Sequence, residues 1–171
     1  MSNEAITMCD VCESLSLLDR AGPKPRTNPV TPHMQLDQVA PAPLRERLIA
    51  LGAALPGVHT GRSGVSIPVS TALLLAPEWA RKGAAEAFMA PGEFAHVHAA
   101  WDGSAHMNLP LHILDKVFAA GWGEPHPIAG RYGFPATIAM VYGPRDESEF
   151  ATVAMLLKIS HAFASGGRLP N

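Results

Sequence analysis

The segment EFAHVHAAWDGSAHMNL, residues 93–109, constrains the fold of this chain more than any other stretch. Two runs in which apolar and polar residues alternate flank the tripeptide Trp-Asp-Gly, the pattern of two β-strands joined by a tight turn. Three of the chain's eight histidines lie in this segment. The sequence therefore predicts an antiparallel hairpin with an unusually dense set of titratable side chains.

The length of the hairpin loop decides which side chains meet. A two-residue Asp-Gly turn would put the histidines on opposite faces of the hairpin. A three-residue loop, residues 101–103, would pair His98 with His106 and His96 with Asn108, and its last residue is a glycine, which suits the left-handed position. We favour the three-residue loop because it also collects the apolar residues on one face, where they can pack against helices.

The polar face of this hairpin favours a functional site over an ordinary solvated surface. Solvent-facing strands usually carry Thr, Lys, Glu or Arg, whereas this face carries His96, His98, His106 and Asn108. Clusters of titratable groups are typical of catalytic and binding sites. Three imidazoles on one face can act as acid/base groups or can bind a metal ion.

The spacing of apolar residues predicts the other elements. A hairpin makes its strands antiparallel, so the expected class is α+β: a single domain with an antiparallel sheet packed against about three helices. The proline-rich residues 1–43 are expected to form an N-terminal tail or linker, and residues 44–168 the domain. Helices are expected over residues 44–55, 110–120 and 146–165, and strands within 63–75 and 134–142.

Composition excludes several classes of function. The net charge is −2 and 16% of the residues are charged, so the clustered Lys and Arg of a nucleic-acid-binding protein are not found. The sequence predicts no membrane span and no signal peptide. Cys9 and Cys12 are interpreted as incidental rather than as a redox pair or half of a zinc site. We expect a cytoplasmic protein whose partner is a small molecule, and the oligomeric state stays open.

A second block, GWGEPHP at residues 121–127, follows the helix predicted after the hairpin. Trp122 is either a buried core residue or an aromatic wall of the same pocket. His126 would add a fourth histidine to that pocket. Further along, VYGPRDESE contributes Tyr142 and Arg145. Arg145 either holds an anionic group of a ligand or pairs with a nearby carboxylate.

These blocks together resemble the luciferase-domain family, whose best-known members are the luciferases of luminous fungi. The resemblance rests on EFAHVH, on Asp102, Ser104 and His106 at matching intervals, on GWGEPHPIAG and on YGPRDESE, all in the same order. It runs from about Glu93 to Gly166 and is weaker before the hairpin. It implies a compact relative without the N-terminal apolar segment of the fungal members.

The resemblance implies an oxidoreductase that adds molecular oxygen to a small enolic or aromatic compound of the hydroxypyrone or phenol type, with no organic cofactor. Because such a compound must lose a proton before it reacts with oxygen, the histidines are the candidate catalytic acid/base groups: His96, His98, His106 and His126. The candidate substrate-binding residues are Trp122, Asn108, Asp102, Tyr142 and Arg145. Glu124 stands where fungal members can have Gln, so it is not expected to be an essential acid.

Two other functions stay open on the sequence. His96, His98 and His106 can supply three ligands to zinc, and a carboxylate from Glu93 or Asp102 would suit iron or manganese. In a regular strand Glu93 alternates onto the face opposite His96, which weakens it as a ligand. The remaining alternative is a domain that binds a small aromatic ligand without turnover. Molecular oxygen is therefore the expected co-substrate, and a divalent metal ion belongs to the alternative in which the histidines are its ligands.

Overall fold

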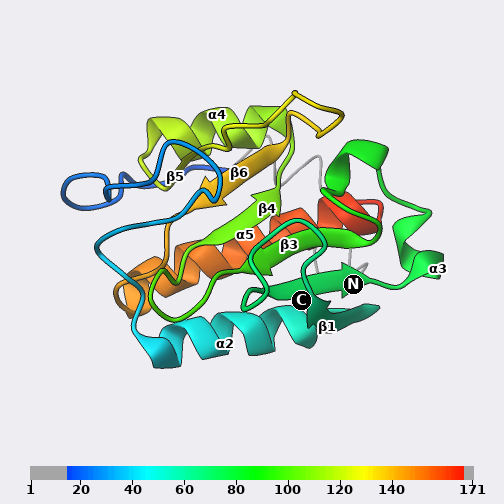
Figure 1. The fold of residues 1–171 in the computed structure, drawn as a ribbon, viewed down its shortest axis with the longest axis horizontal. Helices are drawn as coiled ribbons and strands as arrows, with labels where there is room; N and C mark the ends of the chain where they lie inside the picture. The colour runs from blue at the N-terminus through cyan, green and yellow to red at the C-terminus, as the bar shows by residue number, and fades with distance from the viewer. Residues whose placement is uncertain (1–14, 168–171) are drawn as a thin grey trace, which may run out of the picture.

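The computed structural model describes residues 15–167, so Cys9 and Cys12 lie outside the described part of the chain. Within these residues, six strands form one sheet in the spatial order β1-β2-β3-β4-β6-β5, and every neighbouring pair is antiparallel (Figure 1). The strands are β1 Val58–Arg62, β2 Thr71–Leu75, β3 Glu93–Val97, β4 Ala105–Asn108, β5 Gly123–Pro125 and β6 Ile138–Val141.

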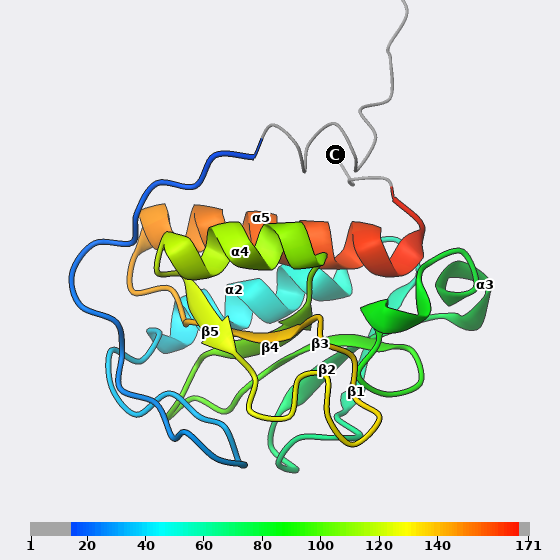
Figure 2. The same ribbon diagram turned by 90° about the horizontal axis from the view of Figure 1, so that it is seen from above.

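Helices cover one face of the sheet, and loops cover the opposite face (Figure 2). This arrangement confirms the α+β class. The covering helices are α2 Ala42–Ala53, α4 Leu111–Ala119 and α5 Glu147–Ser165. The short helix α3 Pro77–Ala80 and a 3₁₀ turn, Ala85–Ala87, lie between β2 and β3 in the chain. No helix within residues 15–167 is long and apolar enough to cross a membrane.

The hydrophobic core lies between the sheet and these helices. Four hairpin residues face it, and each is at most 1% exposed: Ala95, Val97, Ala105 and Met107. Side chains at alternate positions point to opposite faces of a strand, so the histidines between these residues point to the loop-covered face. The core therefore fixes which way the histidines point.

Helix α5 is determined by both of its ends. Asp146 precedes the helix in an extended conformation, and its carboxylate accepts a hydrogen bond from the amide of Glu149, which satisfies a first-turn donor. At the other end Gly166 has φ = 93°, in the left-handed region that ends helices. The predicted helix over residues 146–165 is confirmed, because its start and stop signals are local.

The chain before the hairpin differs from the sequence prediction. Residues 63–70 form a loop instead of a strand, and Val65 and Val69 are exposed. Pro68 cannot donate to a β-ladder, and the alternation of valines around it was misleading. The sequence analysis also missed β1, because its residues are mostly exposed and polar. The strand within 134–142 is confirmed as β6.

Helix α4 begins one residue later than predicted, with Pro110 preceding it, and Gly121 follows it with φ = 76°. Of the apolar residues in its first turn, Leu111 is 57% exposed and Ile113 is fully buried. The spacing of apolar residues around the first turn fits two faces, and contact with the sheet selects between them.

The hairpin has the predicted faces but a different register. His96 pairs with His106, and the amide of His98 donates to the carbonyl oxygen of Ser104. Residues 99–103 therefore form the loop, and the predicted pairing of His98 with His106 is wrong. Because the register differs by two residues, each side chain keeps its predicted face. Gly103 has φ = 71°, the left-handed conformation expected of the last loop residue.

Residues 15–41, here called the N-terminal strap, pass the β5 edge of the sheet and reach its loop-covered face (Figure 2). Two hydrogen bonds tie the strap to the domain: the Arg20 amide donates to Ala120 O, and the Gly143 amide donates to the side-chain Oε1 of Gln35. Between these points a bridge from Thr27 to Gln35 folds the strap back on itself. The turn of this fold carries His33 to the histidine face of the sheet.

Candidate functional site

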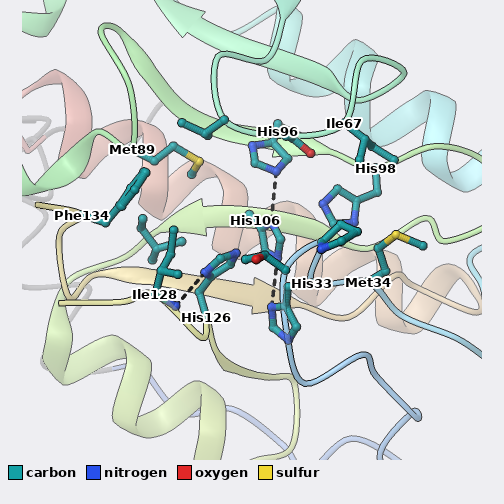
Figure 3. A pocket seen from close by; sticks show the side chains of 15 residues that line it. His33, Met34, Ile67, Met89, His96, His98, His106, His126, Ile128 and Phe134 are labelled. Carbon is teal, nitrogen blue, oxygen red and sulfur yellow. Dashed lines mark hydrogen bonds between the residues drawn. The ribbon is translucent and has the colours of Figure 1, made fainter. Parts of the chain in front are cut away.

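A cavity of about 370 Å³ opens on the loop-covered face of the sheet. Five separate parts of the chain build its wall: the strap, the loop 63–70, the segment before β3, the hairpin, and the connection between β5 and β6 with the start of β6 (Figure 3). Its apolar lining comes mainly from loops and includes Ile67, Met89, Ile128 and Phe134. Its polar lining contains five histidines: His33, His96, His98, His106 and His126.

The three hairpin histidines are in mutual contact. Nε2 of His96 lies 3.0 Å from Nδ1 of His106, directly across the β3–β4 pair. The ring of His98 stacks beside that of His96 at 5.3 Å between centroids and meets the edge of His106 at 4.5 Å. All three side chains are at least 96% buried with respect to solvent. One nitrogen of each ring therefore faces a shared, nearly dry space.

A carboxylate holds the outer nitrogen of His96. Oε1 of Glu93 lies 2.8 Å from Nδ1 of His96, and the Ser63 hydroxyl and the Gly64 amide donate to the same carboxylate. Sequence alternation placed Glu93 on the opposite face, and this expectation is wrong. A register shift between β2 and β3 at Leu73/Leu74 interrupts the alternation there.

A second carboxylate holds the outer nitrogen of His98. Oδ2 of Asp102 accepts a hydrogen bond from Nδ1 of His98, and the Ser104 amide donates to Oδ1 of the same residue at 3.0 Å. Asp102 is 1% exposed, so solvent does not compete for this contact. When the ring carries this one proton, its lone pair lies on Nε2, and that nitrogen has no partner among the described residues.

The strap extends the cluster through His33. Nδ1 of His33 lies 3.2 Å from Nε2 of His106, and Nε2 of His33 lies 2.7 Å from Oε1 of Glu124. The Tyr142 hydroxyl donates to the other oxygen of Glu124 at 2.9 Å. A continuous hydrogen-bonded chain therefore runs from Glu93 through three imidazoles to Glu124.

The hydrogen-bonded chain from Glu93 to Glu124 requires one more proton than its three histidines carry when they are neutral. It contains four links, from Glu93 to His96, His106, His33 and Glu124, and each link needs one proton. A neutral imidazole carries one proton, so three imidazoles satisfy three of the four links. The fourth link requires a buried imidazolium, a protonated carboxyl group or another cation.

The surroundings disfavour the first two of these possibilities. Burial lowers the pKa values of His33 and His96, and it lowers that of His106 strongly, which keeps these rings neutral. Burial opposes ionisation of Glu93 and Glu124, but their hydrogen bonds outweigh it and lower both pKa values below the ordinary range. Two ionised carboxylates thus flank a row of neutral rings.

His126 has a different role in the cavity wall. Its Nδ1 accepts the Ile128 amide at 3.3 Å, so the neutral ring carries its proton on Nε2. Burial lowers the His126 pKa to about 4, with His33 adding to the effect. At neutral pH His126 therefore presents an N–H donor to the cavity.

The structure does not bring the other predicted ligand-binding residues to the cavity lining. Trp122 is 5% exposed within the hydrophobic core, and its indole donates to Leu18 O at 2.7 Å. Asn108 donates to Thr137 Oγ1 and Glu86 O. Tyr142 and Asp102 lie behind the lining, where they contact Glu124 and His98.

Arg145 binds residues of the strap and does not line the cavity. It donates to Ala21 O and to Oε1 of Gln38, and it pairs with Glu149. The sequence left two roles open for Arg145, binding an anionic ligand group or pairing with a carboxylate, and the structure shows the pairing.

Sequence reasoning missed His33 and left Glu124 aside as non-essential. His33 lies in a proline-rich segment without apolar periodicity, so no local pattern relates it to a hairpin that starts 60 positions later. For Glu124, its position two residues before His126 in the sequence was the available signal.

Comparison with known proteins relates the site to one family. Residues 91–160 match the model of the luciferase domain. The luciferase of Armillaria ostoyae is 39% identical over 70 residues, which are 40% of this chain and 26% of that protein. The luciferases of Armillaria gallica and Neonothopanus nambi are 37% and 36% identical over regions of the same extent. The resemblance to the luciferase-domain family is therefore confirmed for this region.

The extent of the match is limited. The chain spans about a quarter of the length of the curated relatives that it matches. The matched region contains His96, His98, His106 and His126, together with Glu93, Asp102 and Glu124, and it excludes the strap. No solved structure matches the chain.

Proposed function

We propose that this protein is a luciferase-like oxidoreductase that adds molecular oxygen to a small enolic or aromatic compound, of the hydroxypyrone or phenol type, without an organic cofactor. The observation that carries the proposal is the cavity of about 370 Å³ in which apolar side chains face five histidines. A planar compound with an ionisable hydroxyl group matches such a lining, because its ring contacts the apolar wall and its oxygen contacts the imidazoles.

The reaction first requires loss of the hydroxyl proton. An enol or phenol donates electrons to oxygen far more readily as its anion, and a base oriented by a third group favours that loss. His98 fits this role because Asp102 fixes the proton on Nδ1 and leaves the Nε2 lone pair toward the cavity. The Nε2–H of His126 can donate to the resulting anion.

The balance of the reaction is simple. The substrate anion forms a carbon–oxygen bond with molecular oxygen, which takes up the electrons, and the proton returns to the distal oxygen to give a hydroperoxide. Substrate and oxygen supply every atom and electron of this product. The protein therefore contributes proton transfer, orientation and a dry cavity.

Oxygen consumption tests the proposal. Purified protein is mixed with a panel of hydroxypyrones and phenols, an oxygen electrode follows uptake, and mass spectrometry with isotopically labelled oxygen identifies the product. We expect uptake with at least one compound, and a rate about 10²–10⁴-fold lower for His98→Ala. His112→Ala, at an exposed position of α4, is the matched control and is expected to retain the wild-type rate.

Two results would contradict the proposal. Tight binding of these compounds without oxygen uptake would make the protein a ligand-binding domain. An unchanged rate in His98→Ala would remove the histidine cluster from the reaction.

A further inference from the structure

We propose that His96, His98 and His106 bind a divalent transition-metal ion, of the class of Zn²⁺, Fe²⁺ or Co²⁺, through His96 Nε2, His98 Nε2 and His106 Nδ1. This inference deepens the proposed function and rests on the same cavity. It concerns the identity of the group that stabilises the substrate anion.

The three rings offer their ligand atoms within one small volume. One ring nitrogen of each histidine lies within 4.8 Å of one ring nitrogen of each of the other two. Two nitrogens bound to one ion at ~2.0–2.1 Å stand roughly 2.9–3.4 Å apart for angles between ~90° and ~109°. The measured 3.0 Å between His96 Nε2 and His106 Nδ1 falls in this range. The pair is therefore spaced for a shared ion as well as for a hydrogen bond.

The outer nitrogens carry the partners that metal-bound histidines require. A ligating imidazole usually donates its other N–H to a carboxylate or a similar acceptor, which fixes the tautomer and orients the ring. Glu93 accepts at His96 and Asp102 accepts at His98. At His106 the acceptor is Nδ1 of His33, which in turn donates to Glu124. The outer nitrogen of every proposed ligand thus has a hydrogen-bond acceptor that orients the ring.

An ion also completes the charge count of the hydrogen-bonded chain. When it replaces the proton between His96 and His106, the remaining links need one proton each, and the neutral rings carry that number. Glu93 and Asp102 are each within 1% of full burial, and their two negative charges lie next to the ligands of a doubly charged cation. The buried carboxylates then have a partner that offsets their desolvation.

A second set of histidines, His33, His106 and His126, is also closely spaced but suits an ion less well. The Ile128 amide donates to His126 Nδ1, so the proton of that ring occupies the nitrogen that would have to bind the metal. His126 therefore remains a donor to a ligand in the cavity. Three protein ligands leave a coordination position open on the cavity side, where a substrate oxygen can bind.

In the proposed reaction the ion would promote loss of the proton from the hydroxyl group of the substrate. A hydroxyl group bound to a divalent cation ionises at a much lower pH than a free one. His98 would then act as a ligand and not as the base. Neutral imidazole ligands suit zinc, iron and related ions better than magnesium or calcium, which prefer oxygen.

Metal content tests the inference independently of turnover. Tag-free protein purified without chelator is measured by elemental analysis, and chelator-treated protein is titrated with Zn²⁺ and, by visible spectroscopy, with Co²⁺. We expect close to one ion per chain, and its loss in His98→Ala and His106→Ala. Asp102→Asn keeps the shape of the side chain and is expected to weaken Co²⁺ binding about 10–100-fold.

Two controls make the assignment specific. His112→Ala removes an exposed histidine of α4, and the double variant Cys9→Ser/Cys12→Ser removes the other strong metal-binding side chains near the N-terminus. Both are expected to keep the ion. Circular dichroism of each variant shows whether loss of metal accompanies loss of fold.

The possible failures can be told apart. Wild-type protein that contains no metal and takes up neither Zn²⁺ nor Co²⁺ would overturn the metal site and leave His98 as the base of the proposed reaction. Metal retained at full affinity by both Asp102→Asn and a folded His98→Ala variant would also overturn it. Stoichiometric metal without oxygen uptake would support the site and contradict the oxygenase.

Discussion

Nε2 of His33 lies 2.7 Å from Oε1 of Glu124, although 91 positions of the sequence separate the two residues. The contact joins the N-terminal strap to β5, at the edge of the sheet. The His33 side chain is only 1% exposed, whereas that of Glu124 is 26% exposed, so solvent reaches the contact mainly from the Glu124 side. This hydrogen bond therefore holds the strap against β5 and at the same time fixes the position of His33 in the cavity.

Replacement of this histidine tests the linkage. His33→Ala leaves Glu124 with the Tyr142 hydroxyl and removes the acceptor behind His106. We expect a loss of about 1–3 kcal/mol in the free energy of unfolding, measured by urea denaturation, because a hydrogen bond to a charged group is lost. Turnover and Co²⁺ affinity should fall as well. His59→Ala, at an exposed position of β1, should change none of these quantities.

The turn of the hairpin gives a prediction about backbone strain. A Cβ atom at Gly103 would lie 2.8 Å from Cβ of Ala40, and the residue has φ = +71°. Gly103→Ala should therefore destabilise the fold by more than the ~1 kcal/mol of a strained φ alone. Gly133 has φ = +83° with no atom within 4 Å of such a Cβ, so Gly133→Ala should incur the φ cost only. Equal losses in the two variants, measured by thermal unfolding, would contradict this account.

A buried carboxylate outside the cavity makes stability depend on pH. Glu149 pairs with Arg20 and Arg145, with side-chain exposures of 7% for the glutamate and 2% for Arg20. Burial opposes ionisation of Glu149, but hydrogen bonds from Arg145 and the charge of Arg20 outweigh it and lower its pKa below 4.5. The stabilisation is therefore complete above the ordinary pKa and is lost as the pH falls through the lowered one.

Urea denaturation over a range of pH checks this sign. Glu149→Gln should lower the free energy of unfolding by about 3 kcal/mol at neutral pH, and it should flatten the loss of stability on acidification. The control is Glu147→Gln, whose side chain is 71% exposed in its pair with Arg47, and it should change stability by less than about 1 kcal/mol. A Glu149→Gln variant as acid-sensitive as the wild type would refute the assignment.

Trp122 gives a prediction that separates a core residue from a ligand-binding one. Its indole donates to Leu18 O, and its ring packs in the core. Trp122→Phe should therefore lower stability by about 1–3 kcal/mol through the lost volume and the unpaired carbonyl. Its affinity for a cavity ligand, measured by calorimetry, should equal that of the wild type. A large loss of affinity without loss of stability would instead place Trp122 against the ligand.

The accuracy of the sequence analysis follows the range of the interactions involved. The cap of helix α5, Asp146, and its stop signal, Gly166, are its direct neighbours in the sequence, and the faces of the hairpin follow from the alternation of its own residues. Each was predicted. The hairpin register depends on how the loop 99–103 packs, and it was wrong by two residues. Residues 63–70 alternate like a strand, but their proline prevents the ladder that would make them one.

The candidate site shows the same division. The sequence predicted that His96, His98 and His106 share a face, because strand periodicity was combined with the loop length that collects the apolar residues on the other face. It did not predict His33, whose position depends on the path of a proline-rich segment across the fold. It placed Glu93 on the wrong face, because the register shift that redirects this side chain arises from pairing with β2. Contacts between distant segments carry the information that local patterns lack.

The cavity is built from two parts that can change independently. Four of its five histidines belong to residues 91–160, the region shared with the fungal proteins, whereas much of the opposite wall, including His33, comes from the strap at Thr31–Met34 and the loop at Val65–Ile67. Substitutions of the residues around His33 in those two segments would change the shape of the cavity while the histidines stay the same. Proteins with the same reactive half can thereby diverge in what they accept, and exchange of the strap between relatives is a direct way to transfer selectivity.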